Sequence, residues 1–236
     1  MRDVHKVALL IDTSRGCGRE FLLGIARYAR LYGPWNFEVM PGDYRQVVSK
    51  LKRWGGTGII ARISDRRVAQ AVVDANVPTI ALGLTDEQMR GGHPLSKFSS
   101  VSSDALEVSK LAAEHLLERQ FTRFAYVGSD DRVWSKRRER AYCEYLARQG
   151  FEAFVYPTPK RPQDRVWKRE QPFMARWINN LSSPIGLFAC DDNRGWEVLE
   201  ACKLAGFNVP KDAAVVGVNN DDVYCELADP PLSSSR

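Results

Sequence analysis

Polar side chains of a few types recur where short apolar runs end or where predicted helices begin. The residues singled out for their types and positions are Arg19, Arg62, Asp104, Glu107, Trp134, Arg138, Asp191, Asn219 and Asn220. Carboxylates, amides and guanidinium groups can form paired hydrogen bonds with neighbouring hydroxyls, and an aromatic face covers the C–H groups of a sugar ring. This set therefore predicts a binding site for a neutral polyol.

Each of these residues also has an ordinary structural interpretation. An aspartate after a strand is often the N-cap of the next helix, so Asp65, Asp104 and Asp191 fit capping and ligand contact equally well. An arginine such as Arg138 on a predicted helix is more often a surface ion-pair residue, and Trp134 more often anchors a loop. The set as a whole carries more information than any one member.

Signals for catalysis are weak in this sequence. The Gly-Cys-Gly triplet at 16–18 resembles a phosphate-binding loop, but the GxGxxG pattern is incomplete and no GxxxxGK[ST] motif occurs. Cys17 forms no recognisable nucleophile–base pair with any of the 3 histidines, and neither GxSxG nor HExxH is present. We therefore predict that the chain is not an enzyme and binds no cofactor.

Two pairs of adjacent acids, Asp191-Asp192 and Asp221-Asp222, raise the question of a metal site. Such pairs could hold a divalent cation, as in phosphotransfer α/β proteins. Adjacent side chains normally point apart, and none of the 5 cysteines lies in a CxxC pair that would indicate structural zinc. We predict no metal site and keep an α/β enzyme that uses strand-end acids with Mg²⁺ as an alternative.

The candidate residues need elements that bring strand ends together. Residues 7–11 form a continuous apolar run, which is typical of a strand buried on both faces of a parallel sheet. Apolar residues from Phe21 to Tyr32 then recur at helical spacing and stop at Gly33-Pro34. The alternation continues with strands at 35–40, 58–61, 79–82, 124–127, 151–156, 185–189 and 213–218, and helices at 44–54, 66–76, 105–119, 135–148, 171–180 and 193–205.

A polar, glycine-rich stretch at residues 84–97, with little to pack, divides this alternation into two runs. Each run predicts an α/β lobe with a parallel sheet flanked by helices, at residues 1–103 and 104–230. Ligands of such sheets bind at the carboxyl ends of the strands, so we expect the ligand between the lobes. No closing helix is predicted after the strand that ends at Val218.

Composition narrows the class of protein. The 236 residues are 27% charged and 44% hydrophobic, which excludes disordered and collagen-like chains. The formal net charge is +5, but the basic residues are spread along the chain, so charge alone does not indicate nucleic acid. No apolar signal segment opens the chain and no run approaches the roughly 18 apolar residues of a membrane span. We predict a cytoplasmic, soluble protein with no membrane association.

Two passages resemble the sugar-responsive transcription regulators of the lactose/galactose-repressor type. One lies at residues 99–128, and the other runs from Pro184-Ile185 to Asn219-Asn220 and on to Pro231-Leu232-Ser233-Ser234. The segments RWGGTGIIARISD at 53–65 and VPTIALG at 77–83 are most similar to xylose-operon regulators within that group. The resemblance implies a two-lobed periplasmic-binding-protein-like fold, truncated at its C-terminal end, with residues 231–236 as the stub of a crossover back to the first lobe.

The resemblance also implies roles for individual residues. Arg138 matches an arginine that holds sugar hydroxyls, and Asp191 matches a strand-end aspartate of the second lobe. Asn219 and Asn220 match an acidic or amide pair that grips the sugar, although many members have aspartate in place of Asn219. The remaining positions implied to face the ligand or the hinge are Asp104, Glu107, Arg19 and Arg62.

These matches imply the effector-sensing domain of a bacterial transcription regulator with a small sugar, D-xylose, as its expected ligand. DNA is expected to bind only to a helix-turn-helix domain that this sequence does not contain, and the relatives' habit of associating implies a homodimer. A solute-binding protein for sugar transport is a further alternative to the α/β enzyme.

Overall fold

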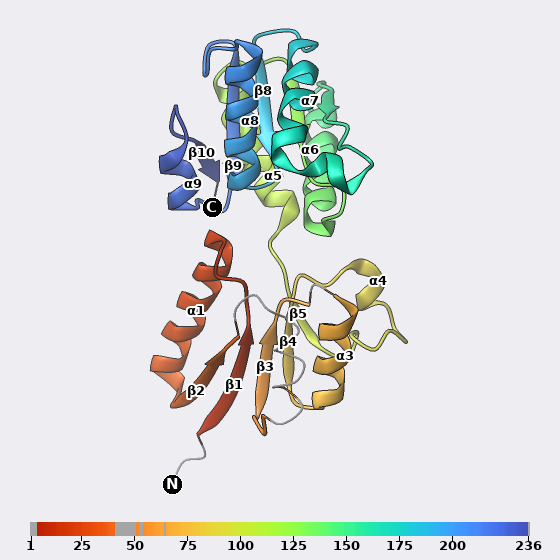
Figure 1. Ribbon diagram of the computed structural model, residues 1–236, viewed down its shortest axis with the longest axis vertical. Helices are drawn as coiled ribbons and strands as arrows, with labels where there is room; N and C mark the ends of the chain where they lie inside the picture. Colours follow the sequence, from red (N-terminus) through yellow and green to blue (C-terminus); the bar gives the residue numbers. More distant parts are fainter. Residues whose placement is uncertain (1–3, 41–50, 52–53, 64, 236) are drawn as a thin grey trace. The chain divides into compact units, whose positions relative to one another are not determined.

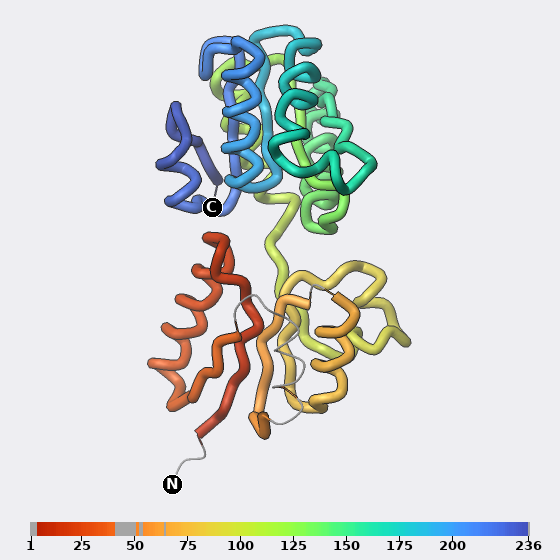
Figure 2. The backbone as a smooth tube through the Cα atoms, in the orientation of Figure 1, coloured from red at the N-terminus to blue at the C-terminus, as the bar shows by residue number. Residues whose placement is uncertain are grey.

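The computed structural model describes residues 4–40, 51, 54–63 and 65–235. The chain divides into two compact units, Met1–Ser103 and Asp104–Arg236. Each unit has its own five-stranded sheet, and no described strand is shared between the two sheets (Figure 1). The described backbone passes once from the first unit into the second (Figure 2). Each unit therefore buries an apolar core of its own against its sheet.

The first unit is a parallel sheet with the strand order β2-β1-β3-β4-β5. Its elements are β1 (His5–Leu10), α1 (Gly16–Tyr32), β2 (Trp35–Val39), β3 (Gly58–Ala61), α3 (Arg66–Ala75), β4 (Thr79–Leu82), α4 (Asp86–Met89) and β5 (Ser99–Val101). Successive residues of a strand point to opposite faces, so Leu9 packs with Phe21 of α1 while Leu10 packs with Val68 of α3. The apolar run at residues 7–11 is buried on both faces, as predicted.

The second unit is a parallel sheet with the strand order β10-β9-β8-β6-β7. Its elements are α5 (Ala105–Glu118), β6 (Phe124–Val127), α6 (Val133–Arg148), β7 (Ala153–Val155), η1 (Pro162–Arg165), α7 (Trp167–Asn179), β8 (Ile185–Ala189), α8 (Asp192–Ala205), β9 (Ala213–Val218), α9 (Asp222–Leu227) and β10 (Ser233–Ser235). Leu187 packs among residues of α7 and α8, and its neighbour Phe188 packs among residues of α5 and α6. Helices thus cover both faces of the sheet (Figure 1), and the predicted α/β architecture is confirmed.

The prediction that residues 84–97 have little to pack is wrong. Leu84 and Leu95 are buried, with 2% and 1% of their surfaces exposed, and they pack with Ala81 of β4. The short helix α4 begins at a capping box in which the Thr85 hydroxyl accepts the Gln88 N–H at 3.0 Å. The segment is polar in its overall composition, yet its two leucines belong to the apolar core of the first unit.

Besides α4 and η1, three further short elements were missed in the sequence. A helix, α9, follows Val218 after all, and β5 and β10 are strands of three residues rich in serine. The strands β5 and β10 form by pairing with a neighbouring strand, as in the register Ser234–Gly217. Neither strand has an apolar pattern of its own that would predict it. Residues 233–235, which we predicted to lie in a stub returning to the first lobe, form the edge of the second unit's sheet.

The helix predicted at residues 44–54 falls mostly outside the described residues. In the part of the chain that the structure covers, no helix combines the length and apolar character needed to cross a membrane.

Candidate functional site

The polar residues of the second unit gather where β6, β8 and β9 end. These strands are neighbours in a parallel sheet, so their carboxyl ends lie at the same edge. The candidate residues that follow these strands, or that lie on the helix after β6, are Trp134, Arg138, Asp191, Asn219 and Asn220.

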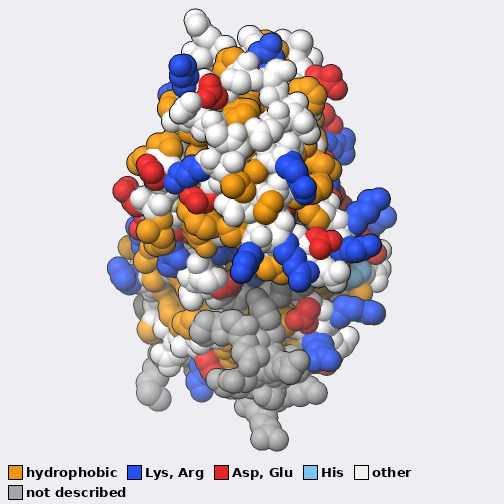
Figure 3. Space-filling view, turned by 45° about the horizontal axis from the view of Figure 1, so that its top comes forward, with side chains coloured by type: hydrophobic (Ala, Val, Ile, Leu, Met, Phe, Trp, Pro, Cys, Tyr) orange, Lys and Arg blue, Asp and Glu red, His pale blue; other side chains and the backbone are white. Residues whose placement is uncertain are grey.

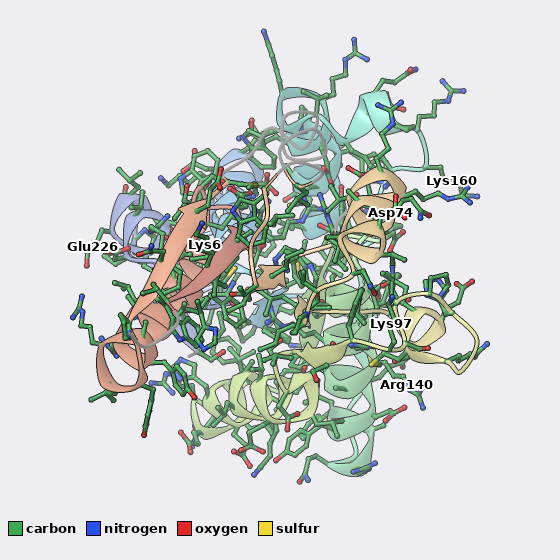
Figure 4. The ribbon with its side chains drawn as sticks, turned by 90° about the horizontal axis from the view of Figure 1, so that it is seen from below. Lys6, Asp74, Lys97, Arg140, Lys160 and Glu226 are labelled. Carbon is green, nitrogen blue, oxygen red and sulfur yellow. The ribbon has the colours of Figure 1, made fainter. Side chains whose placement is uncertain are left out.

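Arg138 lies on α6 and is almost fully buried, with 4% of its surface exposed. Its Nη1 atom donates a hydrogen bond to the carbonyl oxygen of Cys190 at the end of β8. Its guanidinium carbon lies 5.2 Å from the centre of the Trp134 ring, a cation–π distance. Arg140 instead forms an ion pair with Glu144 and lies on the outside of α6 (Figure 4). Arg138 is therefore not a surface ion-pair residue, and the fold brings it together with Trp134 and the end of β8.

Hydrogen bonds around the first turns of α6 hold this arginine in place. The Tyr126 hydroxyl donates to the Ser135 carbonyl oxygen at 2.7 Å, and the Ser129 N–H donates to the Ser135 hydroxyl at 2.9 Å. The Ser109 hydroxyl of α5 donates to the Arg138 carbonyl oxygen at 3.0 Å. The helix is thus tied to β6 and to α5, which restricts movement of the backbone that carries the guanidinium group.

Asp191 is the N-cap of α8. Its Oδ1 atom accepts the Arg194 N–H at 2.8 Å, which confirms the capping interpretation for this buried aspartate. Burial raises the pKa of the preceding Cys190 to about 12, so its thiol is neutral at physiological pH. Contact between Asp191 and a ligand remains a prediction.

Asn219 and Asn220 form the turn after β9 with left-handed backbone. Their φ angles are 100° and 47°, a region that asparagine adopts more readily than most residues with a side chain. The Asn219 N–H donates to the Ser235 carbonyl oxygen at 2.9 Å, and the Asn220 N–H donates to the Ser234 hydroxyl at 2.9 Å. The strand β10 therefore fixes this turn at the carboxyl end of β9.

Asp104 and Glu107 lie exposed in the first turn of α5. The Asp104 Oδ1 atom caps the helix by accepting the N–H groups of Leu106 at 2.9 Å and Glu107 at 3.1 Å. Glu107 forms an ion pair with Lys110 in which Oε1 and Nζ are 3.6 Å apart. Both residues thus have structural contacts within α5, and their contact with a sugar remains a prediction.

In the first unit, Arg62 directly follows β3, and Arg19 lies in the first turn of α1, the helix that follows β1. The strands β1 and β3 are paired neighbours. The Arg19 Nη1 atom donates to the Thr13 carbonyl oxygen at 3.2 Å. A hydrogen bond from the Ser14 N–H lowers the pKa of Asp12, and the charge of Arg62 acts in the same direction. The carboxyl end of this sheet therefore also holds an ionised carboxylate near a guanidinium group.

The adjacent acids Asp191 and Asp192 point apart, as expected for neighbouring residues. Asp191 caps its own helix, whereas Asp192 accepts the Asp221 N–H at 2.7 Å. Among the described residues, no group of three or more His, Cys, Asp or Glu side chains could hold a metal ion.

Lys and Arg side chains are dispersed among acidic and apolar ones on the face shown in Figure 3.

Comparison with known proteins decides the family. A sequence profile of the periplasmic binding protein-like domain matches residues 113–236, which is more than half of the chain. The chain belongs to the periplasmic binding protein-like family. A second profile, the XylR N-terminal domain, matches residues 6–100 of this family member.

Curated relatives of this periplasmic binding protein-like chain include the xylose operon regulatory proteins of Escherichia coli K12 and Haemophilus influenzae. Each is 26% identical over 234 residues, which is 98% of this chain. The chain spans 58% of the length of the Escherichia coli protein and 59% of the Haemophilus influenzae protein.

Solved structures share the fold. The xylose-binding transcription activator XylR superposes with a TM-score of 0.80 at 24% identity, over 99% of this chain and 59% of that one. A periplasmic binding protein/LacI transcriptional regulator from Alkaliphilus metalliredigens, complexed with D-xylulofuranose, has a TM-score of 0.73 at 18% identity, over 97% of this chain and 83% of that one. Both confirm the periplasmic-binding-protein-like fold of this chain.

This family member also contains a buried charged group that the sequence analysis missed. Arg194 of α8 pairs with Glu170 of α7 and, at 2.7 Å, with Glu197, and its guanidinium carbon lies 5.3 Å from the centre of the Tyr156 ring. Burial raises the pKa of Glu197, and the charge of Arg194 opposes that shift. The spacing of Arg194 and Glu197 was visible in the sequence, but only the packing of α7 on α8 shows that the pair is buried.

Proposed function

We propose that this chain is the effector-sensing domain of a bacterial transcription regulator and that its ligand is a small sugar, D-xylose. The observation that carries the proposal is the buried Arg138, whose guanidinium group lies beside an indole ring at the carboxyl end of a parallel sheet. Ligands of open α/β sheets bind at that end, and an arginine beside an aromatic ring suits hydroxyls and the C–H face of a sugar. The names of the curated relatives support xylose as the sugar.

In this proposal Arg138 donates hydrogen bonds to sugar hydroxyls and Trp134 covers an apolar face of the ring. Asn219 and Asn220 both donate and accept through their amide groups, which discriminates hydroxyl positions. The further sugar-binding residues of the proposal are Asp191, Asp104, Glu107, Arg19 and Arg62.

The sugar is bound and released unchanged, so the chain is not an enzyme in this proposal. A sugar shifts the equilibrium between two conformations of a protein only by the difference in its binding free energy for the two. In this proposal that difference is what changes the activity of the regulator. DNA binds to a helix-turn-helix domain outside this sequence, the regulator acts in the cytoplasm, and two copies associate as a homodimer. The name of the structure with a TM-score of 0.80, a transcription activator, supports this regulatory role.

A ligand screen with matched variants tests the proposal. The thermal midpoint of the chain is measured with D-xylose, L-arabinose, D-ribose, D-glucose and a nucleotide with Mg²⁺. A ligand at about 100 times its dissociation constant adds roughly 2.7 kcal/mol to the free energy of unfolding. At about 2–4 °C per kcal/mol for a chain of this size, the thermal midpoint should rise by about 5–11 °C. We expect a shift with D-xylose.

The arginine is tested by comparing Arg138→Ala with Arg140→Ala, an exposed residue of the same helix. Loss of a buried charged donor costs roughly 1.5–3 kcal/mol, so Arg138→Ala should weaken D-xylose binding by tenfold or more while Arg140→Ala binds like the parent chain. Equal affinity of the two variants would remove Arg138 from the site. A shift with nucleotide and Mg²⁺ but with no sugar would favour the α/β enzyme instead.

A further inference from the structure

A buried carboxylate that the proposed sugar site does not use lies directly behind the Asn219–Asn220 turn. Asp192 is the first residue of α8 and has 1% of its surface exposed. Both of its carboxylate oxygens accept hydrogen bonds from groups of the protein itself. Its Oδ2 atom accepts the Asp221 N–H at 2.7 Å, and its Oδ1 atom accepts the Ser234 hydroxyl of β10.

The Ser234 hydroxyl connects this carboxylate to the turn. While it donates to Asp192, it accepts the Asn220 N–H at 2.9 Å. The Asn219 N–H donates to the Ser235 carbonyl oxygen, so three consecutive N–H groups of the turn are hydrogen-bonded. Two of the three depend on Asp192, one directly and one through Ser234.

The turn needs this support because its backbone is unfavourable. Asn219 and Asn220 both have positive φ angles, which non-glycine residues keep only where their surroundings hold them. Gly217 of β9 leaves room for the Asp192 carboxylate, because a Cβ atom at this position would lie 2.3 Å from the Asp192 Oδ1 atom. The Asp192 side chain of α8, the Ser234 hydroxyl of β10 and Gly217 of β9 thus lie together.

We infer that Asp192 is a positioning residue, which holds the Asn219–Asn220 turn in its sugar-binding conformation through Asp221 and Ser234 without touching the sugar. The inference rests on the proposed function for its ligand. The hydrogen bonds that carry it belong to the ligand-free chain, so part of its test needs no sugar.

Asp192→Ala removes both acceptors and is the decisive variant. We expect its dissociation constant for D-xylose, measured by calorimetry, to rise by about tenfold or more, because the buried Asp221 N–H loses its partner. Asp192→Asn keeps an oxygen for Asp221 and offers an amide donor to Ser234, so it should stay within about threefold of the parent. Ser234→Ala removes only the link to Asn220, so its dissociation constant for D-xylose should lie between those of Asp192→Asn and Asp192→Ala.

Asp212→Ala is the matched control. Asp212 lies just before the opposite end of β9, where its Oδ2 atom accepts the Asn208 N–H at 2.8 Å. A general loss of stability would affect both alanine variants, whereas the inference expects only Asp192→Ala to bind D-xylose weakly. Circular dichroism of each variant checks that it is folded.

Amide hydrogen exchange in the absence of sugar separates this inference from the proposed function. Exchange at residues 219–221 should become about tenfold faster in Asp192→Ala and not in Asp212→Ala. If the parent chain binds no sugar, the proposed function fails, and the exchange result still decides whether Asp192 holds the turn. Parent-like exchange at residues 219–221 in Asp192→Ala, or parent-like sugar affinity in that variant, would overturn the inference.

Discussion

At the scale of single residues, identical side chains next to each other in the sequence do different work. Asp191 and Asp192 are adjacent, yet one caps its helix and the other ties α8 to the loop after β9. Arg138 and Arg140 are two positions apart, yet one is buried against β8 and the other forms an exposed ion pair. Residue type alone therefore does not assign a role in this chain.

Asp192 also predicts a pH dependence of stability. Burial raises its pKa to about 6 from an ordinary value of 3.8, and the nearby acids Asp191 and Asp221 act in the same direction, while the Asp221 N–H and Ser234 hydroxyl oppose the shift. Burial raises the pKa of the nearby Cys225 to about 11, and the charge of Asp192 acts in the same direction, so the Cys225 thiol stays neutral over this range.

Because the folded state holds the Asp192 proton more tightly than the unfolded chain, its contribution to stability is fully present below pH 3.8 and is lost as the pH rises through about 6. Chemical unfolding of the parent and of Asp192→Asn should thus give a free-energy difference that moves in favour of the variant between about pH 4 and pH 7. A difference that stays constant over this range would contradict the assignment.

At the scale of elements, caps and neighbouring strands decide where each helix or strand begins. Asp65, Asp104 and Asp191 each accept N–H groups in the first turn of the helix that follows, so all three capping interpretations hold. The serine-rich strand β10 exists because β9 offers it a partner, and it then supplies the hydroxyl and carbonyl that hold the Asn219–Asn220 turn. The three-residue strand β10 thus supports the Asn219–Asn220 turn of the candidate site.

Asp104 separates capping from ligand contact in one pair of variants. Asp104→Ala should lower the free energy of unfolding by about 1 kcal/mol, because two N–H groups of α5 lose their acceptor. Asp104→Ser keeps a capping oxygen without a carboxylate, so it should preserve stability. Weaker D-xylose binding by Asp104→Ser at unchanged stability would add a ligand contact to the cap, and parent-like binding would leave Asp104 as a cap only.

At the scale of the whole molecule, the chain is two units of one architecture, each a five-stranded parallel sheet with its own core. Arg62 follows β3 in the first unit, and Asp191 and the Asn219–Asn220 turn follow β8 and β9 in the second, so in each unit proposed sugar-binding residues lie at the carboxyl edge of a parallel sheet. In the second unit the opposite end of the same sheet carries the loop held by Asp212.

This polarity predicts where a bound sugar protects the second unit. Saturating D-xylose should slow amide exchange at residues 128–138, 190–194 and 219–221, because ligand contacts oppose local opening of the carboxyl-end segments. Exchange at residues 208–212, at the amino end of β9, serves as the internal control and should stay unchanged. Protection confined to residues 208–212 would place the ligand at the wrong end of the sheet.

The sequence by itself determined the α/β architecture, most of the strands and helices, and the grouping of polar residues after the strands, because apolar periodicity and helix caps are local properties. The family resemblance also came from local motifs. Only the tertiary structure decided which of these polar residues are buried and what they contact. The Arg138–Cys190, Asp192–Asp221 and Asp192–Ser234 hydrogen bonds join residues 52, 29 and 42 positions apart. Contacts of that range depend on how the strands are ordered in the sheet, and no local pattern records that order.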